Sequence, residues 1–488
     1  MHFSLFVRVV MVLTVCISLT TTMGAQAGDS PKARLAAVAD HLTRYVVLKN
    51  STRQYMQLAS QMESLHVPAV SMAAIRNGQI DWAQAYGVTS LGGERATAGT
   101  LFGAASMSKP VVAAGVLRLV EDGKVDLDTD VNRYLKRWKV PENAFTTEKK
   151  VTVRELLNHT SGIGTHNGEI YDPSQPIPTF LQLLDGEKPA RSPAVRVEAP
   201  PAMKFAYSNG GYLVLALLIE DVTGETFAKY MKRAVLDPLG MKDSTFDAPL
   251  PPAWARRGAT GYWEDGKSGI PPAKFVAANL AAGGLWTTPT DLAKFLIEIQ
   301  REYEGASHRV LHQPTAQLLA RPGLGGWGLG FRVQGSPENS LLSHEGSGVF
   351  QDDMLIYLHG NGFIVMTSGG GGGALADELI RSAGIVYGFT DFRPLERTAI
   401  EVSPEILSRY PGTYGFVKVA MDGGTLTAEI PEGSQPQTLY AESPTHFFVL
   451  DGPQELQFDT NGQKAESVQF ITPMNHGMLL KRSEKDRK

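Results

Sequence analysis

The sequence predicts a mixed α/β (α+β) fold, in which an antiparallel sheet flanked by terminal helices is followed by a small antiparallel β-barrel. Strand-like segments occur early, at 70–75 and 80–86, and return late, between 328 and 367. The stretch between them, 126–291, contains helix-like pieces separated by Pro and Gly loops and predicts a mainly helical subdomain. We therefore expect one sheet that is built from both ends of a single domain.

The first elements follow from local patterns. Residues 33–65 have helical spacing without internal Gly or Pro, which predicts a long N-terminal helix that ends before Pro68. Asn77-Gly78 stands between two apolar runs and predicts a tight hairpin. From 110 to 120 almost every residue is apolar or small, so this segment is expected to be a helix buried on all sides.

The end of the chain has a different character. A helix-like segment at 374–386 follows the glycine run 369–373, which lacks the Lys-Ser or Lys-Thr pair of a phosphate-binding loop. Beyond it, short strand-like segments alternate with Asp-Gly and Asn-Gly turns. We expect a main domain at 28–395 and a β-barrel domain at 396–488.

The N-terminus resembles an export signal. An apolar stretch at 9–19 is followed by polar residues and by Ala25-Gln26-Ala27, which predicts a signal peptide over 1–27 and a periplasmic or secreted protein. The only cysteine, Cys16, lies inside this segment, so no thiol nucleophile and no disulfide are expected in the mature chain. No later stretch reaches the roughly 20 apolar residues of a spanning helix. The 488 residues carry a net charge of -4 without a dense basic run, which disfavours nucleic acid as a partner.

Ser106 and Lys109 form the first chemical motif. They open the predicted buried helix three residues apart, so their side chains share one helical face. A serine hydroxyl is a weak nucleophile until a neighbouring group takes its proton. The positive end of a helix also favours the negative charge that develops there.

Tyr207 and Asn209 form the second motif, on a loop before the apolar segment 213–221. An ammonium close to a phenol favours phenolate, so Lys109 would make Tyr207 a general base. Asn209 would orient Lys109 or the substrate with its amide.

The third motif is His344-Glu345-Gly346-Ser347-Gly348, which leads into an apolar pair. This pattern predicts the edge of a strand at which another group comes so close that a Cβ would not fit. A substrate backbone would lie at this edge.

These motifs, in this order, resemble the serine β-lactamase and penicillin-binding-protein superfamily, in which Ser-x-x-Lys is catalytic. The likeness is greatest to the branch with class C β-lactamases, D-peptidases and esterases. It spans about residues 35–390 through phrases such as "LFGAASMSKP", "LLNHTSGI", "AYSNGGY" and "AAGGLWTTPTDLAKF". The tail looks like the lipocalin-like barrel that often follows this branch.

The resemblance implies a β-lactamase/transpeptidase-like fold and an acyl-enzyme on Ser106, with Lys109 sharing its proton and Tyr207 as the base. It implies that Asn209 and His344 bind substrate, that the N–H groups of Ser106 and Ser347 form the oxyanion hole, and that no metal or organic cofactor is required. His344-Glu345-Gly346 replaces the usual Lys-Thr-Gly, which argues against efficient β-lactam turnover because a carboxylate would meet no firm positive charge.

Several functions remain open from the sequence. A serine hydrolase of small esters, amides or D-amino-acid peptides is the leading interpretation, and cell-wall fragments are possible substrates. A weak β-lactamase, a D-Ala-D-Ala carboxypeptidase and a non-catalytic peptidoglycan-binding protein are the alternatives. An α/β-hydrolase is excluded because Gly-x-Ser-x-Gly is absent. His159 and His166 lack the His-Glu-x-x-His helix of a zinc hydrolase and are interpreted as structural.

Overall fold

The computed structural model describes residues 30–49, 55–164, 168–460, 462–473 and 475–484. The predicted signal peptide at 1–27, with Cys16, and His166 lie outside these residues. No helix in the described part of the chain is long and apolar enough to cross a membrane.

A six-stranded antiparallel sheet forms the centre of the main domain. Its strand order is β10-β11-β12-β13-β2-β3, so the two N-terminal strands lie beside the four late ones, as the sequence predicts. Asn77 and Gly78 both have positive φ, at 52° and 69°, which is the backbone of a tight hairpin turn. The bounds are β2 Ala69–Arg76, β3 Gln79–Gly87, β10 Arg332–Gln334, β11 Leu341–Gly346, β12 Gln351–Tyr357 and β13 Gly362–Thr367.

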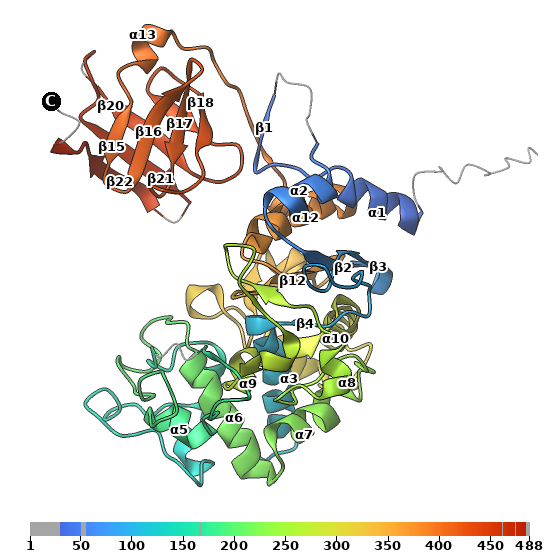
Figure 1. Ribbon diagram of the computed structural model, residues 1–488. Coiled ribbons are helices and arrows are strands. Elements are labelled where there is room, and N and C mark those ends of the chain that lie inside the picture. Colours follow the sequence, from blue (N-terminus) through green and yellow to red (C-terminus); the bar gives the residue numbers. More distant parts are fainter. Residues whose placement is uncertain (1–29, 50–54, 165–167, 461, 474, 485–488) are drawn as a thin grey trace, which may run out of the picture.

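Helices cover both faces of this sheet (Figure 1). One face packs against α1 (Pro31–Ala39), α2 (Leu58–Ser64) and α12 (Gly372–Tyr387). The other face packs against α3 (Ser108–Glu121) and α10 (Pro289–Tyr303). Eleven of the fourteen residues of α3 are buried, which confirms the predicted core helix.

The prediction of a single long helix at 33–65 is wrong. The chain forms α1, then the short strand β1 (Val46–Leu48), then α2. β1 pairs in parallel with β14 (Leu395–Arg397). The β-branched Val46 and Val47 favour a strand, and a partner almost 350 residues away in the sequence completes it.

Between the early and late strands lies a region of short helices and loops. It holds α4 (Val153–Leu157), α5 (Phe180–Asp185), α6 (Asn209–Thr223), α7 (Phe227–Met231), α8 (Pro252–Ala255) and α9 (Leu280–Gly283). Two-residue strand pairs link parts of it, among them β4 (Phe102–Gly103) with β9 (Trp286–Thr287) and β5 (Ile170–Tyr171) with β8 (Val276–Ala277). The buried α6 packs against α9, α4 and α3.

Eight antiparallel strands follow, each paired with the next in sequence order. A bridge between Tyr414 and Arg482 joins the first strand to the end of the last, so the sheet nearly closes into a barrel around its own core. Their bounds are β15 Gly412–Tyr414, β16 Val417–Asp422, β17 Thr425–Glu429, β18 Gln437–Ala441, β19 His446–Phe448, β20 Glu455–Asp459, β21 Ser467–Thr472 and β22 Asn475–Lys481.

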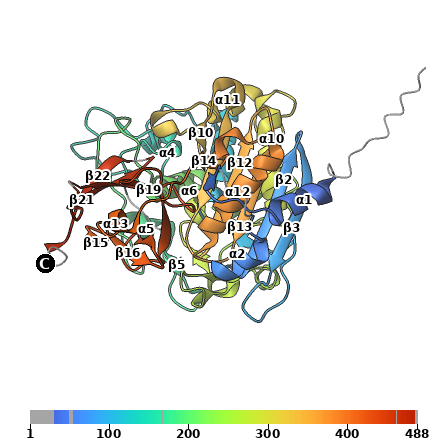
Figure 2. The ribbon, with the colours of Figure 1, turned by 90° about the horizontal axis from the view of Figure 1, so that it is seen from above.

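The barrel lies beside β1 in Figure 1 and beside β14, the partner of β1, in Figure 2. The backbone N–H of Val46 donates to the Leu450 carbonyl at 2.9 Å. Arg397 contacts the carboxylates of Glu442, at 2.9 Å, and of Glu455. His446 completes a compact group with these two glutamates, and the guanidinium offsets half of their charge. The domain boundary at residue 396 remains a proposal, and it falls within β14.

Candidate active site

Ser106 lies in a strained turn at the head of a buried helix. It is the middle residue of the 3-10 turn Ala105–Met107, which runs directly into α3. Ala105 has φ 42°, in the left-handed region that side chains rarely adopt. The Ser108 hydroxyl donates to the Ala105 carbonyl at 2.7 Å and holds this conformation. Strain that persists at one residue because its surroundings fix it is typical of functional turns.

The segment before Ser106 is anchored through β4 and β9. The N–H of Ala104 donates to the Leu285 carbonyl at 2.8 Å, and the N–H of Leu285 donates to the Ser108 hydroxyl at 3.1 Å. The nucleophile turn and the strand β9 therefore hold each other in place.

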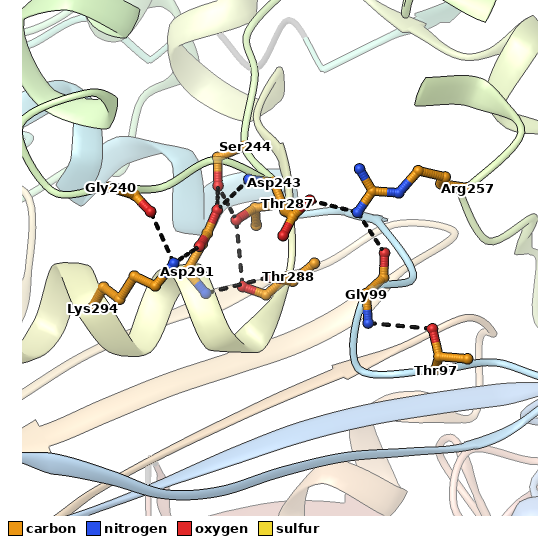
Figure 3. A network of polar contacts seen from close by, with 10 residues as sticks. All are labelled: Thr97, Gly99, Gly240, Asp243, Ser244, Arg257, Thr287, Thr288, Asp291 and Lys294. Atoms are coloured by element: carbon orange, nitrogen blue, oxygen red, sulfur yellow. Dashed lines mark hydrogen bonds and ion pairs between the residues drawn. The ribbon is translucent and has the colours of Figure 1, made fainter. Parts of the chain in front are cut away.

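A buried carboxylate fixes the far side of β9 (Figure 3). Asp291, which is fully buried in the first turn of α10, accepts hydrogen bonds from the Asp243 N–H at 2.7 Å and the Ser244 hydroxyl at 2.9 Å. Lys294 contacts it at 2.6 Å. The Ser244 hydroxyl also lies 2.7 Å from that of Thr287 in β9. The "TTPTDLAK" phrase thus serves to position the strand beside the nucleophile.

Lys109 is fully buried directly beneath Ser106. Its Nζ donates to Ser106 Oγ and to the Ala282 carbonyl, both at 2.9 Å. No carboxylate of the described residues hydrogen-bonds to it, and burial holds the pKa of Lys109 well below its usual range. An amine of this kind is available to accept the proton of the Ser106 hydroxyl.

Tyr207 stands on the other side of Ser106, just before α6. His159 packs against the phenol ring with centroids 4.3 Å apart and accepts a hydrogen bond on Nδ1 from the Ser208 N–H at 3.1 Å. Lys109 Nζ is 4.8 Å from the centre of the Tyr207 ring. His159, in the "LLNHTSGI" phrase, thus has the structural role that the sequence indicates.

The protonation of Tyr207 differs from the expectation. Burial raises the pKa of Tyr207 strongly, and the hydrogen bond from the Ser106 hydroxyl offsets only part of this rise. The nearby Glu345 raises it further. Burial also disfavours the ammonium form of Lys109, which would otherwise stabilise a phenolate, so the surroundings favour the protonated phenol of Tyr207.

Asn209 begins α6 and is one of the residues that line the space in front of Ser106. Its Oδ1 is buried and has no hydrogen-bond partner among the described residues. The expected contact with Lys109 is taken instead by the Ala282 carbonyl. Asn209 is therefore free to contact a substrate.

β11 carries the third motif. Burial lowers the pKa of His344 to about 3, and Lys109 adds to this effect. His344 Nδ1 lies 2.7 Å from the Glu345 carbonyl and must donate to it, because a carbonyl can only accept. This leaves Nε2 of the neutral ring as an acceptor, and it is buried without a partner among the described residues.

The glycine of this motif serves a close backbone approach. A Cβ at Gly346 would lie 2.7 Å from the Ala104 carbonyl oxygen and 3.3 Å from the Ala105 Cβ. The sequence predicts a substrate backbone at this point, whereas the neighbour in the structure is the backbone of Ala104 in the chain itself. This contact sets the distance between β11 and the nucleophile turn.

A cavity of about 300 Å³ opens in front of Ser106. Asn209 and Ser347 line it together with Ser106, so the structure brings these predicted residues to one space. Lys109, Tyr207 and His344 are not among the described residues that line it. A larger cavity of about 560 Å³ beside α2 contains none of these residues.

A Ser-x-x-Lys helix beneath an antiparallel sheet with helices on both faces defines the serine β-lactamase and penicillin-recognising class of proteins. The chain belongs to the β-lactamase family, whose model, described as "Beta-lactamase", matches residues 51–385. The protein is accordingly a serine hydrolase of this family.

Relatives and solved structures agree with this assignment. A penicillin-binding protein of Bacillus subtilis (strain 168) is 25% identical over 450 residues, covering 86% of this chain and 96% of the relative. Esterase EstB of Burkholderia gladioli is 35% identical over 199 residues, covering 39% of this chain and 49% of the esterase.

Two solved structures show the same fold. An octameric penicillin-binding protein homologue from Pyrococcus abyssi superposes with a TM-score of 0.57 at 21% identity, over 87% of this chain and 98% of that one. A D-amino acid amidase from Ochrobactrum anthropi SV3 gives 0.53 at 22% identity, over 66% and 95% of the two chains.

Sequence reasoning missed two parts of the site. The Ala282 carbonyl is a backbone group, and only the run of small residues at 281–284 marks a segment that can approach Lys109 closely. Trp327 packs against Tyr207 and His344, with centroids 5.6 Å and 5.3 Å away, and nothing in its sequence context points to the cleft.

Proposed function

We propose that the protein cleaves small esters, amides or D-amino-acid peptides through an acyl-enzyme on Ser106. The observation that carries this is the 2.9 Å hydrogen bond between Ser106 Oγ and a lysine amine that is fully buried. Burial disfavours the ammonium form, so the amine lone pair can accept the proton of the serine hydroxyl.

In the acylation step, Ser106 Oγ attacks the substrate carbonyl carbon and its proton passes to Lys109 Nζ. The N–H groups of Ser106 and Ser347 stabilise the oxyanion. The carbonyl re-forms, the bond to the leaving group breaks, and Tyr207 supplies the leaving group with a proton that Lys109 replaces. Water then repeats the sequence on the acyl-enzyme and releases the acid.

The third motif favours esters and amides over β-lactams. A penicillin presents a carboxylate, and His344 offers it only the Nε2 lone pair of a neutral ring. The names of the relatives, an esterase and a D-amino acid amidase among them, support the same range of substrates.

Labelling with a fluorescent fluorophosphonate tests the nucleophile. Wild type and Ser347→Ala, which keeps its backbone N–H, should label alike, whereas Ser106→Ala should not label. Hydrolysis of p-nitrophenyl acetate should fall at least about 10³-fold in Ser106→Ala. Equal labelling of wild type and Ser106→Ala would show that another residue is the nucleophile.

We also propose export to the periplasm or the exterior, on the pattern at 1–27. N-terminal sequencing of the mature protein should begin at Gly28. An intact Met1 in protein recovered from the cytoplasm would contradict export.

A further inference from the structure

The cavity in front of Ser106 faces the acyl part of a substrate, if the proposed function holds. The leaving group must depart toward the Tyr207 hydroxyl, because that group gives it a proton. Neither Tyr207 nor His344 is among the described residues that line the cavity. The space therefore receives the portion of the substrate that stays on Ser106.

Glu169 is the one ionisable side chain among the described residues of this lining. It is half-buried and directly precedes β5, whose pairing with β8 fixes the backbone there. Ala277 of β8 lines the same cavity. The strand pair thus holds the backbone of Glu169 at the cavity.

Asn209 adds a second acceptor beside Glu169. A Cβ at Gly168 would lie 3.4 Å from Asn209 Nδ2, so the segment that carries Glu169 packs against this amide. Asn209 Oδ1 is buried without a described partner. A buried acceptor that lacks a donor costs about 1–3 kcal/mol, so a ligand that brings N–H donors is favoured.

The surrounding charges do not cancel the carboxylate. Burial disfavours the ammonium form of Lys109, and its amine is directed to Ser106 and Ala282. Glu345 and Arg332 lie 4.0 Å apart as an ion pair, and neither residue lines the cavity. The cavity therefore favours a cation and disfavours a carboxylate.

Apolar side chains form the rest of the wall. Phe275, Val349 and Phe350 are buried, and Trp263 is 49% exposed at the opening. Such a wall suits an aliphatic or aromatic substituent next to the charged group.

We propose that Glu169 and Asn209 bind a free ammonium on the acyl group, which makes α-aminoacyl esters and amides the preferred substrates. The ammonium donates to the Glu169 carboxylate and to Asn209 Oδ1, and the amino-acid side chain packs against the apolar wall. Acyl groups whose nitrogen is acylated lose both the charge and two of the three donors.

A matched pair of substrates tests this specificity: alanine p-nitroanilide and N-acetyl-alanine p-nitroanilide, each as both enantiomers, with p-nitrophenyl acetate as an uncharged reference. Wild type should cleave the free-amine anilide with the higher kcat/KM. Glu169→Gln should raise the KM for that substrate about tenfold, which corresponds to the loss of one charge-assisted hydrogen bond at a half-buried position. Its KM and kcat for p-nitrophenyl acetate should not change. Glu338→Gln, at an exposed carboxylate outside the cavity, is the control.

The outcomes separate this proposal from the proposed function. If wild type hydrolyses p-nitrophenyl acetate and does not prefer the free amine, the role of Glu169 is wrong and the acyl-enzyme stands. A loss in Glu169→Gln that is equal for all substrates also overturns it, because a folding defect would act in that way. If wild type neither labels at Ser106 nor hydrolyses the ester, the proposed function itself fails.

Discussion

The identity of the base can be tested by comparing Lys109→Met with Tyr207→Phe on two leaving groups. Lys109 Nζ is 2.9 Å from Ser106 Oγ and is buried, whereas burial strengthens the hold of Tyr207 on its proton. Lys109 should then take the proton from Ser106, and Tyr207 should deliver it to the leaving group. Lys109→Met should therefore impair the removal of the proton from Ser106, and Tyr207→Phe should impair the protonation of the leaving group.

Loss of a general base typically lowers the rate by about 10²–10⁴-fold. Lys109→Met should therefore lose about 10²–10⁴-fold in kcat/KM on a p-nitrophenyl ester and on an amide alike. Tyr207→Phe should lose a similar factor on the amide, whose amine leaves only when protonated. On the ester it should lose no more than about tenfold, because p-nitrophenolate leaves without a proton.

The pH profile of wild type provides a second measurement. Activity requires uncharged Lys109, so kcat/KM should rise with pH through the lowered pKa of this amine and reach a plateau below the range of ordinary lysines. The raised pKa of Tyr207 predicts no fall across the neutral range. Circular dichroism of both variants checks folding. If Tyr207→Phe loses as much on the ester as Lys109→Met does, Tyr207 is the base and the assignment from burial is refuted.

Two further predictions concern packing and burial. Gly346→Ala should lower kcat/KM about 10²-fold, as expected for a displacement of about 1 Å, because its Cβ would meet the Ala104 carbonyl at 2.7 Å. Gly373→Ala, with no atom nearer than 3.9 Å, should keep full activity, and equal losses in the two variants would contradict the argument. Glu302 is fully buried and burial raises its pKa to about 7. The folded state then binds a proton that the unfolded state releases, so stability falls as pH rises from about 4 to about 7, by up to about 3 kcal/mol. In Glu302→Gln, the free energy of unfolding measured with urea should fall less over this pH range, by about this amount. An equal fall with pH in wild type and variant would contradict the role of Glu302.

The sequence predicted the elements that depend on local spacing. Ser106 and Lys109 are three residues apart in a helix, so their contact follows from helical geometry alone. The hairpin at Asn77-Gly78 follows from turn chemistry, and the barrel from regularly spaced turns. In each case the deciding residues are neighbours in the chain.

What the sequence could not predict depends on distant parts of the chain. The strand Val46–Leu48 forms because β14 lies beside it, so a helical pattern at 33–65 was misleading. The pKa values of Lys109 and Tyr207 are shifted by burial among residues from several elements, and burial opposes the phenolate that a charged Lys109 would favour. Glu169 is a single acidic residue in a loop, and only the folded chain brings it to the cavity.

Acceptors in and near the substrate space predict that this site disfavours anionic substrates. Asn209 and Glu169 line the cavity, and Asn209 Oδ1, the Glu169 carboxylate and the buried Nε2 of His344 are all hydrogen-bond acceptors. A substrate carboxylate brings only acceptors as well, and each buried acceptor left unpaired costs about 1–3 kcal/mol. An ammonium or an amide N–H brings the missing donors. The residues that cleave the bond can therefore be the same as in other members of the family, while the acceptors at these positions select cationic substrates over anionic ones. Rapid turnover of nitrocefin, which carries a carboxylate, would contradict this selection.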